Sequence, residues 1–93
     1  MYRRRGSSPP GELASPTLPE VVLSVVADTI LDWESYAGPA PFNWQIWQAG
    51  LLFDATPGTD NNYGPVAPGL PYFILGVDSI GNPFTQQSNI VTV

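Results

Sequence analysis

Eleven prolines and nine glycines are spread through this 93-residue chain, and they restrict its fold more than any other feature. Both residues interrupt regular segments, so their density argues against long helices and favours short strands joined by turns. The stretches between them are rich in Val, Ile, Thr, Tyr, Phe and Trp, which prefer half-buried pleated surfaces. A chain of this length holds one domain with one modest hydrophobic core.

Composition divides the chain into two parts. Residues 1–19 hold Pro9, Pro10, Pro16 and Pro19 with Gly and Ser between them. We expect this part to be an extended arm that does not fold by itself. Residues 20–93 contain the apolar segments and are expected to form the folded domain.

Charge is distributed unevenly between these parts. Arg3, Arg4 and Arg5 are the only basic residues, and together with Glu12 they give residues 1–19 a net charge of +2. Residues 20–93 carry the other seven of the eight acidic residues, a net charge of −7, and the two parts sum to −5. Phosphate contacts need Lys or Arg, so the domain is poorly suited to nucleic acid, and three charges in the arm add little affinity.

The inventory of reactive side chains is poor. The absence of cysteine and histidine excludes disulfides and thiolate metal sites, and removes the commonest general base. Asp32 and Glu34 lie two apart and are expected on the solvated face of a strand. Residues 60–64 resemble part of a calcium loop but have too few acidic ligands, which favours a turn. We therefore expect no enzymatic activity, no catalytic or metal-binding residues, no cofactor and no small-molecule substrate.

Alternation of apolar and polar residues predicts six or seven short strands. In one strand it places Leu31 and Trp33 on the inner face, and in the next it places Phe42, Trp44 and Ile46 together. Strands this short and closely spaced indicate two packed sheets, because the apolar face of one sheet must be covered by another. The expected strands are 21–26, 29–34, 42–48, 51–53, a short one near Tyr63, 72–77 and 89–93.

From about Pro19 to Val93 the sequence resembles the fibronectin type III family. Trp33 stands where that family keeps its core tryptophan, and residues 72–82 (YFILGVDSIGN) resemble its sixth strand and following turn. Ser88 followed by residues 90–93 resembles the last strand. The resemblance implies an all-β fold, a fibronectin type III or immunoglobulin-like two-sheet sandwich, with an extended N-terminal arm.

The sequence departs from the family pattern in two places. Gly76 replaces the usual Ala, which we expect to weaken strand packing. Residues 66–72 resemble the tyrosine corner of the family, with Val66 for Leu, but the two matches need different registers. Tyr72 therefore either makes the corner hydrogen bond or lies further along the strand.

Members of this family mostly bind, space or decorate, and the fold alone does not fix a function. Residues 1–8 have no apolar stretch behind their basic residues, and no apolar run approaches the ~20 residues that span a bilayer. With its proline-rich arm, the chain resembles small bacteriophage virion proteins, either head decoration or tail components. We expect a structural virion protein, made in the host cytoplasm, whose partners are capsid or tail proteins and copies of itself.

Trp47 is the main candidate for binding within the domain. It falls on the opposite strand face from Trp44 and Ile46, near Leu51, Leu52 and Phe53, and together these side chains would form an apolar interaction patch. The alternative is that the opposite sheet or the connection 54–71 covers Trp47.

Arg3, Arg4 and Arg5 are the second candidate. They form either a solvated basic tail or an anchor that pairs with carboxylates of a shell protein or of an identical subunit.

Two other functions remain open. A carbohydrate-binding or adhesion module would stack sugar rings on exposed aromatic side chains such as Trp47 and Tyr63. A cytoplasmic regulator would bind one partner peptide at a sheet edge.

Overall fold

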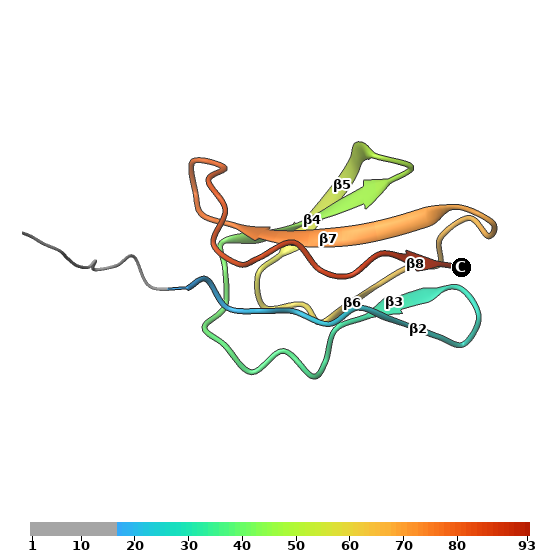
Figure 1. The fold of residues 1–93 in the computed structure, drawn as a ribbon, viewed down its shortest axis with the longest axis horizontal. Helices are drawn as coiled ribbons and strands as arrows, with labels where there is room; N and C mark the ends of the chain where they lie inside the picture. The colour runs from blue at the N-terminus through green and yellow to red at the C-terminus, as the bar shows by residue number, and fades with distance from the viewer. Residues whose placement is uncertain (1–16) are drawn as a thin grey trace, which may run out of the picture.

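The computed structural model describes residues 17–93, and these residues form strands and turns without a helix (Figure 1). The all-β expectation is confirmed for this part of the chain. Its strands are β2 (Ser24–Val26), β3 (Ile30–Asp32), β4 (Asn43–Gln48), β5 (Leu51–Pro57), β6 (Asn62–Tyr63), β7 (Pro71–Val77) and β8 (Val91–Thr92).

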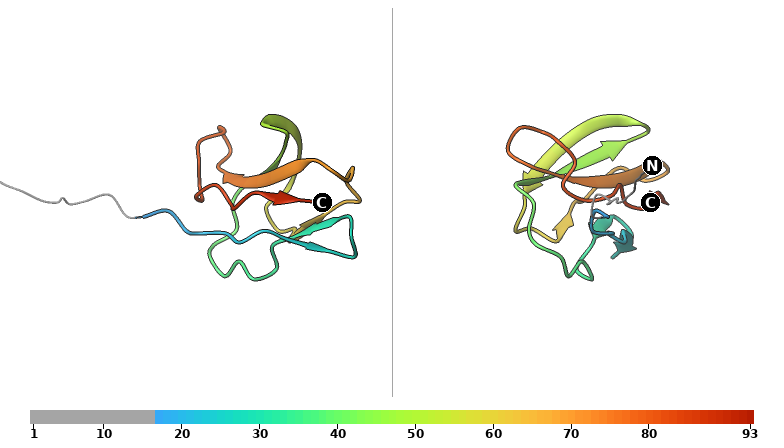
Figure 2. Two further views of the ribbon diagram at one scale, coloured as in Figure 1. Left: turned by 45° about the vertical axis from the view of Figure 1, so that its right-hand side comes forward. Right: turned by 60° about the vertical axis from the view of Figure 1, so that its left-hand side comes forward.

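The strands form two antiparallel sheets. One has the order β2-β3-β6, and the other has the order β5-β4-β7-β8. The two sheets lie over each other in a β-sandwich-like arrangement (Figures 1 and 2). Each sheet therefore has an inner face, which meets the other sheet, and an outer face.

The core lies between the sheets and contains two tryptophans. Trp33 directly follows β3 and Trp44 lies in β4, and their ring centroids are 5.6 Å apart. Leu31 and Trp33 are both buried, as the alternation predicts. The other buried apolar residues of this cluster are Val21, Leu23, Ile46, Val66, Tyr72 and Ile74.

Tyr72 settles the question of register left open by the sequence. It lies in β7, and its hydroxyl donates a hydrogen bond to the main-chain oxygen of Ala67 at 3.0 Å. Gln48 of β4 donates to the same hydroxyl at 3.0 Å. Tyr72 thus makes the hydrogen bond to the preceding loop and is also part of the strand, so the two alternatives are both true.

The first expected strand, 21–26, is regular only over Ser24–Val26. Before it, Val21 and Leu23 are buried and Val22 is exposed, as in a strand. The ladder partner of Leu23 is a side chain: Asn89 accepts from the Leu23 N–H at 2.8 Å and donates to the Leu23 carbonyl at 2.9 Å. The last strand is likewise shorter than expected, Val91–Thr92.

The expected strand 51–53 is too short, because β5 continues to Pro57. It pairs with β4 from Gln48↔Leu51 to Asn43↔Pro57 and is an edge strand of the four-stranded sheet. The prediction treated Asp54 and the residues after it as loop because Asp and Pro are rare in strands. Pairing along the whole of β4 outweighs that local preference.

The expected inward position of Phe42 is wrong. Its side chain is 61% exposed, whereas the neighbouring Pro41 is buried. β4 begins only at Asn43, and the ring of Pro41 occupies the space beside Gly76 on the inner face. No room for a phenylalanine ring remains there.

Gly76 does not weaken the packing of β7, contrary to the expectation. Its N–H donates to Thr85 Oγ1 at 3.0 Å, and Thr85 is fully buried against it. A Cβ on Gly76 would lie 2.7 Å from Thr85 Cγ2 and 3.1 Å from Pro41 Cγ. The missing side chain of Gly76 therefore leaves the space in which Thr85, in the segment after β7, packs.

Candidate functional site

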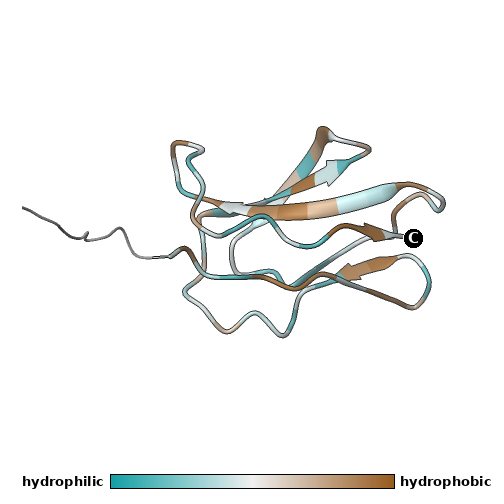
Figure 3. Cartoon of the chain, in the orientation of Figure 1, coloured by the Kyte–Doolittle hydropathy of each residue, from teal (hydrophilic) through white to brown (hydrophobic). Residues whose placement is uncertain are grey.

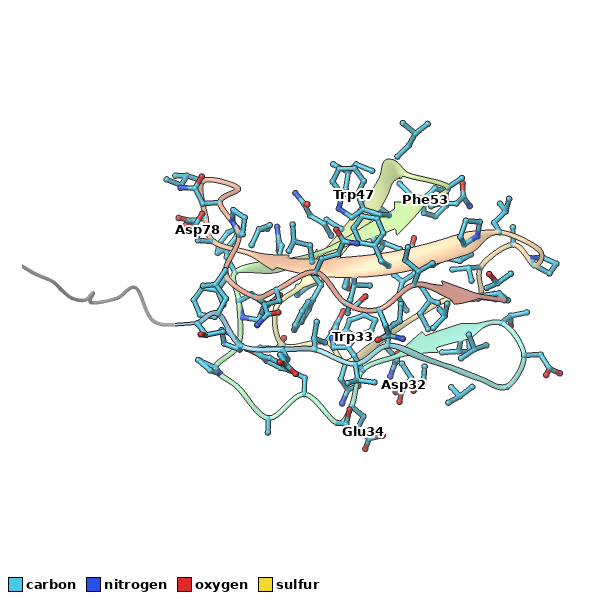
Figure 4. All side chains as sticks on the ribbon, in the orientation of Figure 1. Asp32, Trp33, Glu34, Trp47, Phe53 and Asp78 are labelled. Carbon is cyan, nitrogen blue, oxygen red and sulfur yellow. The ribbon has the colours of Figure 1, made fainter. Side chains whose placement is uncertain are left out.

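The alternation of β4 determines which way Trp47 faces. Ile46 pairs with Ile74 of β7, and both are fully buried between the sheets. The next pair, Trp47 and Phe73, therefore lies on the opposite face. In Figure 4, Trp47 and Phe53 lie on the side of the four-stranded sheet that faces away from Trp33.

Trp47 and Phe73 form a flat aromatic pair on this outer face. Their ring centroids are 5.4 Å apart and their planes differ by 9°. The indole N–H of Trp47 donates to Gln45 Oε1 at 3.1 Å, so the polar atom of the ring is already occupied. Trp47 is half-buried, and neither the opposite sheet nor the connection 54–71 covers it completely.

A β-bulge in β5 brings further apolar side chains beside this pair. Trp47 pairs with Leu52 and Ile46 pairs with Asp54, which leaves Phe53 as the extra residue. Leu51, Leu52 and Phe53 are 73%, 54% and 51% exposed. Figure 3 shows the hydrophobic colour at the start of this strand. Leu51 pairs with Gln48, whose side chain bonds to the inward Tyr72, so Leu51 lies at the hairpin end on the other side of the strand. We define the outer apolar face as Trp47, Leu52, Phe53 and Phe73.

Phe73 belongs to this face and was not singled out by the sequence. Phe73 could have been found from the alternation in β7, since it lies between the inward Tyr72 and Ile74. The role of Leu52 depends on the bulge, which the sequence of β5 alone does not reveal.

Two carboxylates stand along the edge strand β5. Asp54 accepts a hydrogen bond from the Tyr63 hydroxyl at 2.5 Å and one from the Ala55 N–H at 2.8 Å. These bonds, that of Tyr63 first, hold the pKa of Asp54 below its ordinary value. Asp60 accepts a hydrogen bond from the Thr56 hydroxyl. Asp54 therefore stays ionised at neutral pH. It pairs with the inward Ile46 and bonds to Tyr63 of the other sheet, so it lies on the inner side of β5.

Tyr63 is separate from that face. It pairs with the inward Leu31 in the three-stranded sheet and packs against the core, and its hydroxyl is bound to Asp54. Burial, followed by the bond to Asp54, raises the pKa of Tyr63 to about 12. The structure does not bring Trp47 and Tyr63 together on one surface.

A hollow of about 260 Å³ lies on the other side of the molecule, between residues 33–40 and 58–61. Trp33, Tyr36 and Trp44 line it, together with Glu34 and Asp60. The indole N–H of Trp33 is enclosed and has no hydrogen-bond partner. Both tryptophans that line the hollow are only 1% exposed, so these two rings offer a ligand little surface.

The acidic residues considered for chemistry are dispersed. Asp32 and Glu34 lie on the outward side of the three-stranded sheet (Figure 4). Asp78 lies in the turn after β7, where its Oδ1 accepts from the N–H groups of Ile80 and Asn82. Within residues 17–93, no three His, Cys, Asp or Glu side chains are grouped as metal ligands would be.

Arg3, Arg4 and Arg5, the second predicted binding site, lie outside the described residues. Among residues 17–93 there is no helix long and apolar enough to cross a membrane. No protein-family model, curated protein or solved structure matches the chain.

Proposed function

We propose that the chain is a non-enzymatic structural protein of a virus particle, which binds a protein partner through the outer apolar face. The observation that carries this proposal is the continuous row Leu52–Trp47–Phe73 across three strands, extended by Phe53. Contiguous exposed apolar side chains of this kind mark protein interfaces. Aromatic residues at the centre of such surfaces contribute most of the binding energy.

We further propose that the domain is a fibronectin type III sandwich. Its three- and four-stranded antiparallel sheets, with the order β2-β3-β6 and β5-β4-β7-β8, support this. The bond from Tyr72, near the start of β7, to Ala67 has the geometry of a tyrosine corner, in which the hydroxyl reaches back a few residues upstream. Buried Trp33 beside β3 adds to the support. A domain of this kind presents surfaces to partners, which agrees with a structural role.

Two rival functions fit the geometry less well. A sugar site needs polar groups around an open ring, whereas Trp47 is stacked on Phe73 and Gln45 is already bonded to its indole. Strand addition by a peptide needs a regular free edge, whereas β5 is interrupted by the bulge at Phe53 and ends at Pro57. Binding of a protein partner to the side chains of the outer apolar face fits the geometry of this sheet better than either rival.

The test is incorporation into virus particles. In the virus that encodes the chain, we expect the variant Leu52→Thr/Phe53→Thr to be made and folded but depleted from purified particles. The matched control is Val22→Thr/Ile80→Thr, which removes two exposed aliphatic side chains outside the face. Val22 leads into β2 of the three-stranded sheet, and Ile80 lies in the turn after β7. Normal incorporation of the Leu52/Phe53 variant, or purified particles without the chain, would overturn the proposal. Binding of the wild-type chain to a glycan array would favour the carbohydrate-binding alternative.

A further inference from the structure

The strongest unexplained feature is a mismatch of charge within one chain. Residues 17–93 carry seven carboxylates and neither Lys nor Arg, whereas Arg3, Arg4 and Arg5 are concentrated near the N-terminus. In a solution of this protein alone, the arm of a copy is therefore the only cationic segment that an acidic domain can meet. Arg pairs well with carboxylates, because its planar guanidinium can donate two parallel hydrogen bonds.

The outer apolar face also suits the prolines of that arm. Proline-rich segments bind to aromatic surfaces in many recognition domains, because such sequences favour an extended form that costs little entropy to fix. Pro9 and Pro10 stand four and five residues after Arg5. The stacked Trp47 and Phe73, with Leu52 beside them, supply a flat aromatic and aliphatic surface.

We propose that the outer apolar face binds residues 3–10 of a second copy of this chain, with Pro9 and Pro10 on the Trp47–Phe73 pair. This inference rests on the proposed function, because it uses the same face as an interface. It adds the identity of one partner. The arginines of the bound arm then pair with the carboxylates along β5.

The spacing of the two segments agrees with this arrangement. Thr56 stands four positions after Leu52 in β5, a distance of about 13 Å along a strand. Pro9 likewise stands four positions after Arg5, about 12 Å in an extended proline-rich chain. With Pro9 beside Leu52, Arg5 reaches the level of Thr56, whose hydroxyl binds Asp60, and passes Asp54 on the way. Asp54 and Thr56 pair with the inward Ile46 and Trp44, so they lie on the inner side of β5. Because β5 is an edge strand, long arginine side chains can reach around it from the outer face to the carboxylates there.

The place where the arm joins the domain favours a second copy over the same one. The main-chain oxygens of Leu18 and Pro19 accept hydrogen bonds from Gln86, which fixes the first described residues at one end of the body. The β4–β5 hairpin, with the outer apolar face beside it, lies toward the other end (Figure 1). Docking of one copy's arm on the next copy is therefore head to tail, the geometry that builds rings or filaments.

The experiment uses three full-length proteins in sedimentation velocity. These are wild type and two variants. Arg3→Glu/Arg4→Glu/Arg5→Glu changes the arm and leaves the outer apolar face intact, while Leu52→Thr/Phe53→Thr changes the face and leaves the arm intact. We expect wild type to associate with rising concentration, and each variant to bind itself at least about tenfold more weakly. An equimolar mixture of the two variants should form a complex of one copy of each, because each supplies what the other lacks. Added salt should weaken that complex.

The control Val22→Thr/Ile80→Thr should associate like wild type, and the melting temperature of each variant verifies that it folds. A mixture of the two variants that stays monomeric would overturn the inference. The inference would also be overturned if wild type stays monomeric at every concentration while its tryptophan emission differs from that of the arginine variant. That result would mean that the arm binds the domain of its own copy. These outcomes leave the proposed function standing if the Leu52/Phe53 variant is still depleted from particles. If that depletion is also absent, both proposals fail.

Discussion

The hydroxyl of Tyr72 joins the loop before β7 to the neighbouring strand. It donates to the carbonyl oxygen of Ala67 at 3.0 Å and accepts from the Gln48 amide at 3.0 Å. The ring is fully buried in the core. Because one buried hydroxyl satisfies two partners, the loop before β7 and the end of β4 are held at fixed positions on the sheet that carries the outer apolar face.

Replacing Tyr72 by Phe should therefore destabilise the domain. The substitution keeps the ring but leaves a carbonyl and an amide without their partner, which costs about 1–3 kcal/mol. Urea denaturation of the full-length protein measures the loss. Tyr36→Phe is the matched control, because the Tyr36 hydroxyl bonds only to the Pro39 oxygen at an exposed position. Equal losses in the two variants would contradict a structural role for the corner bond.

Gly76→Ala should destabilise the domain although alanine is the residue that the family resemblance favours. The added Cβ would lie 2.7 Å from Thr85 Cγ2, and overpacking of this kind costs about 1–3 kcal/mol. Thr85→Ser removes the clashing methyl and keeps the hydroxyl that accepts from the Gly76 N–H. The double variant should recover part of the loss, with Pro41 limiting the recovery. Strictly additive losses in a double-mutant cycle would show that the two residues do not interact.

Asn89→Ala should loosen the first segment of the domain. Its amide is bonded to both the N–H and the carbonyl of Leu23, so the variant leaves two main-chain groups of a buried residue without partners. We expect faster hydrogen exchange at Leu23 and a loss of about 1–3 kcal/mol. Asn82→Ala, in the turn after β7, is the control, because the bond it makes to Asp78 uses its main-chain N–H. Unchanged exchange at Leu23 in Asn89→Ala would refute the pairing.

The bond between Tyr63 and Asp54 should make stability depend on pH at both extremes. The pKa of Asp54 is lowered in the fold, so its contribution is present above the ordinary value of 3.8 and is lost as pH falls below it. The pKa of Tyr63 is raised to about 12, so its contribution is present below pH 10 and is lost as pH rises toward 12. Urea midpoints across pH should show both losses.

Tyr63→Phe should reduce the loss on both the acid and the alkaline side. Tyr36→Phe should leave the acid side unchanged, because Tyr36 bonds to a main-chain oxygen rather than to a carboxylate. A Tyr63→Phe protein with the acid sensitivity of wild type would mean that this bond does not set the pKa of Asp54.

Much of the fold could be predicted from local patterns. Alternation placed Leu31 and Trp33 inward and Trp47 outward, because a strand's side chains alternate whatever lies across from them. The features that were missed depend on contacts distant in sequence. Phe53 is a bulge residue only because Trp47 pairs with Leu52. The need for glycine at position 76 likewise arises from its contact with Thr85, nine residues later.

The candidate site shows the same division. Trp47, Leu51 and Phe53 could be proposed from their apolar character and position. Trp47 and Phe53 lie on the outer apolar face, whereas Leu51 is exposed but pairs with the inward Gln48. The alternation predicts Phe42 in the core only if it is extended one residue before the start of β4. There Pro41, not Phe42, enters the core. The association of Trp47 with Phe73 needed the pairing of β4 with β7, which no pattern within either strand specifies.

Oxidative footprinting of the outer apolar face tests the docking role most directly. The chain is labelled by hydroxyl radicals once as dilute free protein and once within its native assembly, and oxidation of each side chain is measured by mass spectrometry. We predict that Trp47, Leu52 and Phe53 are protected in the assembly while the exposed Val22 and Ile80 are oxidised as in the free protein. Equal oxidation of Trp47, Leu52 and Phe53 in both states would contradict the claim that this face is an interface.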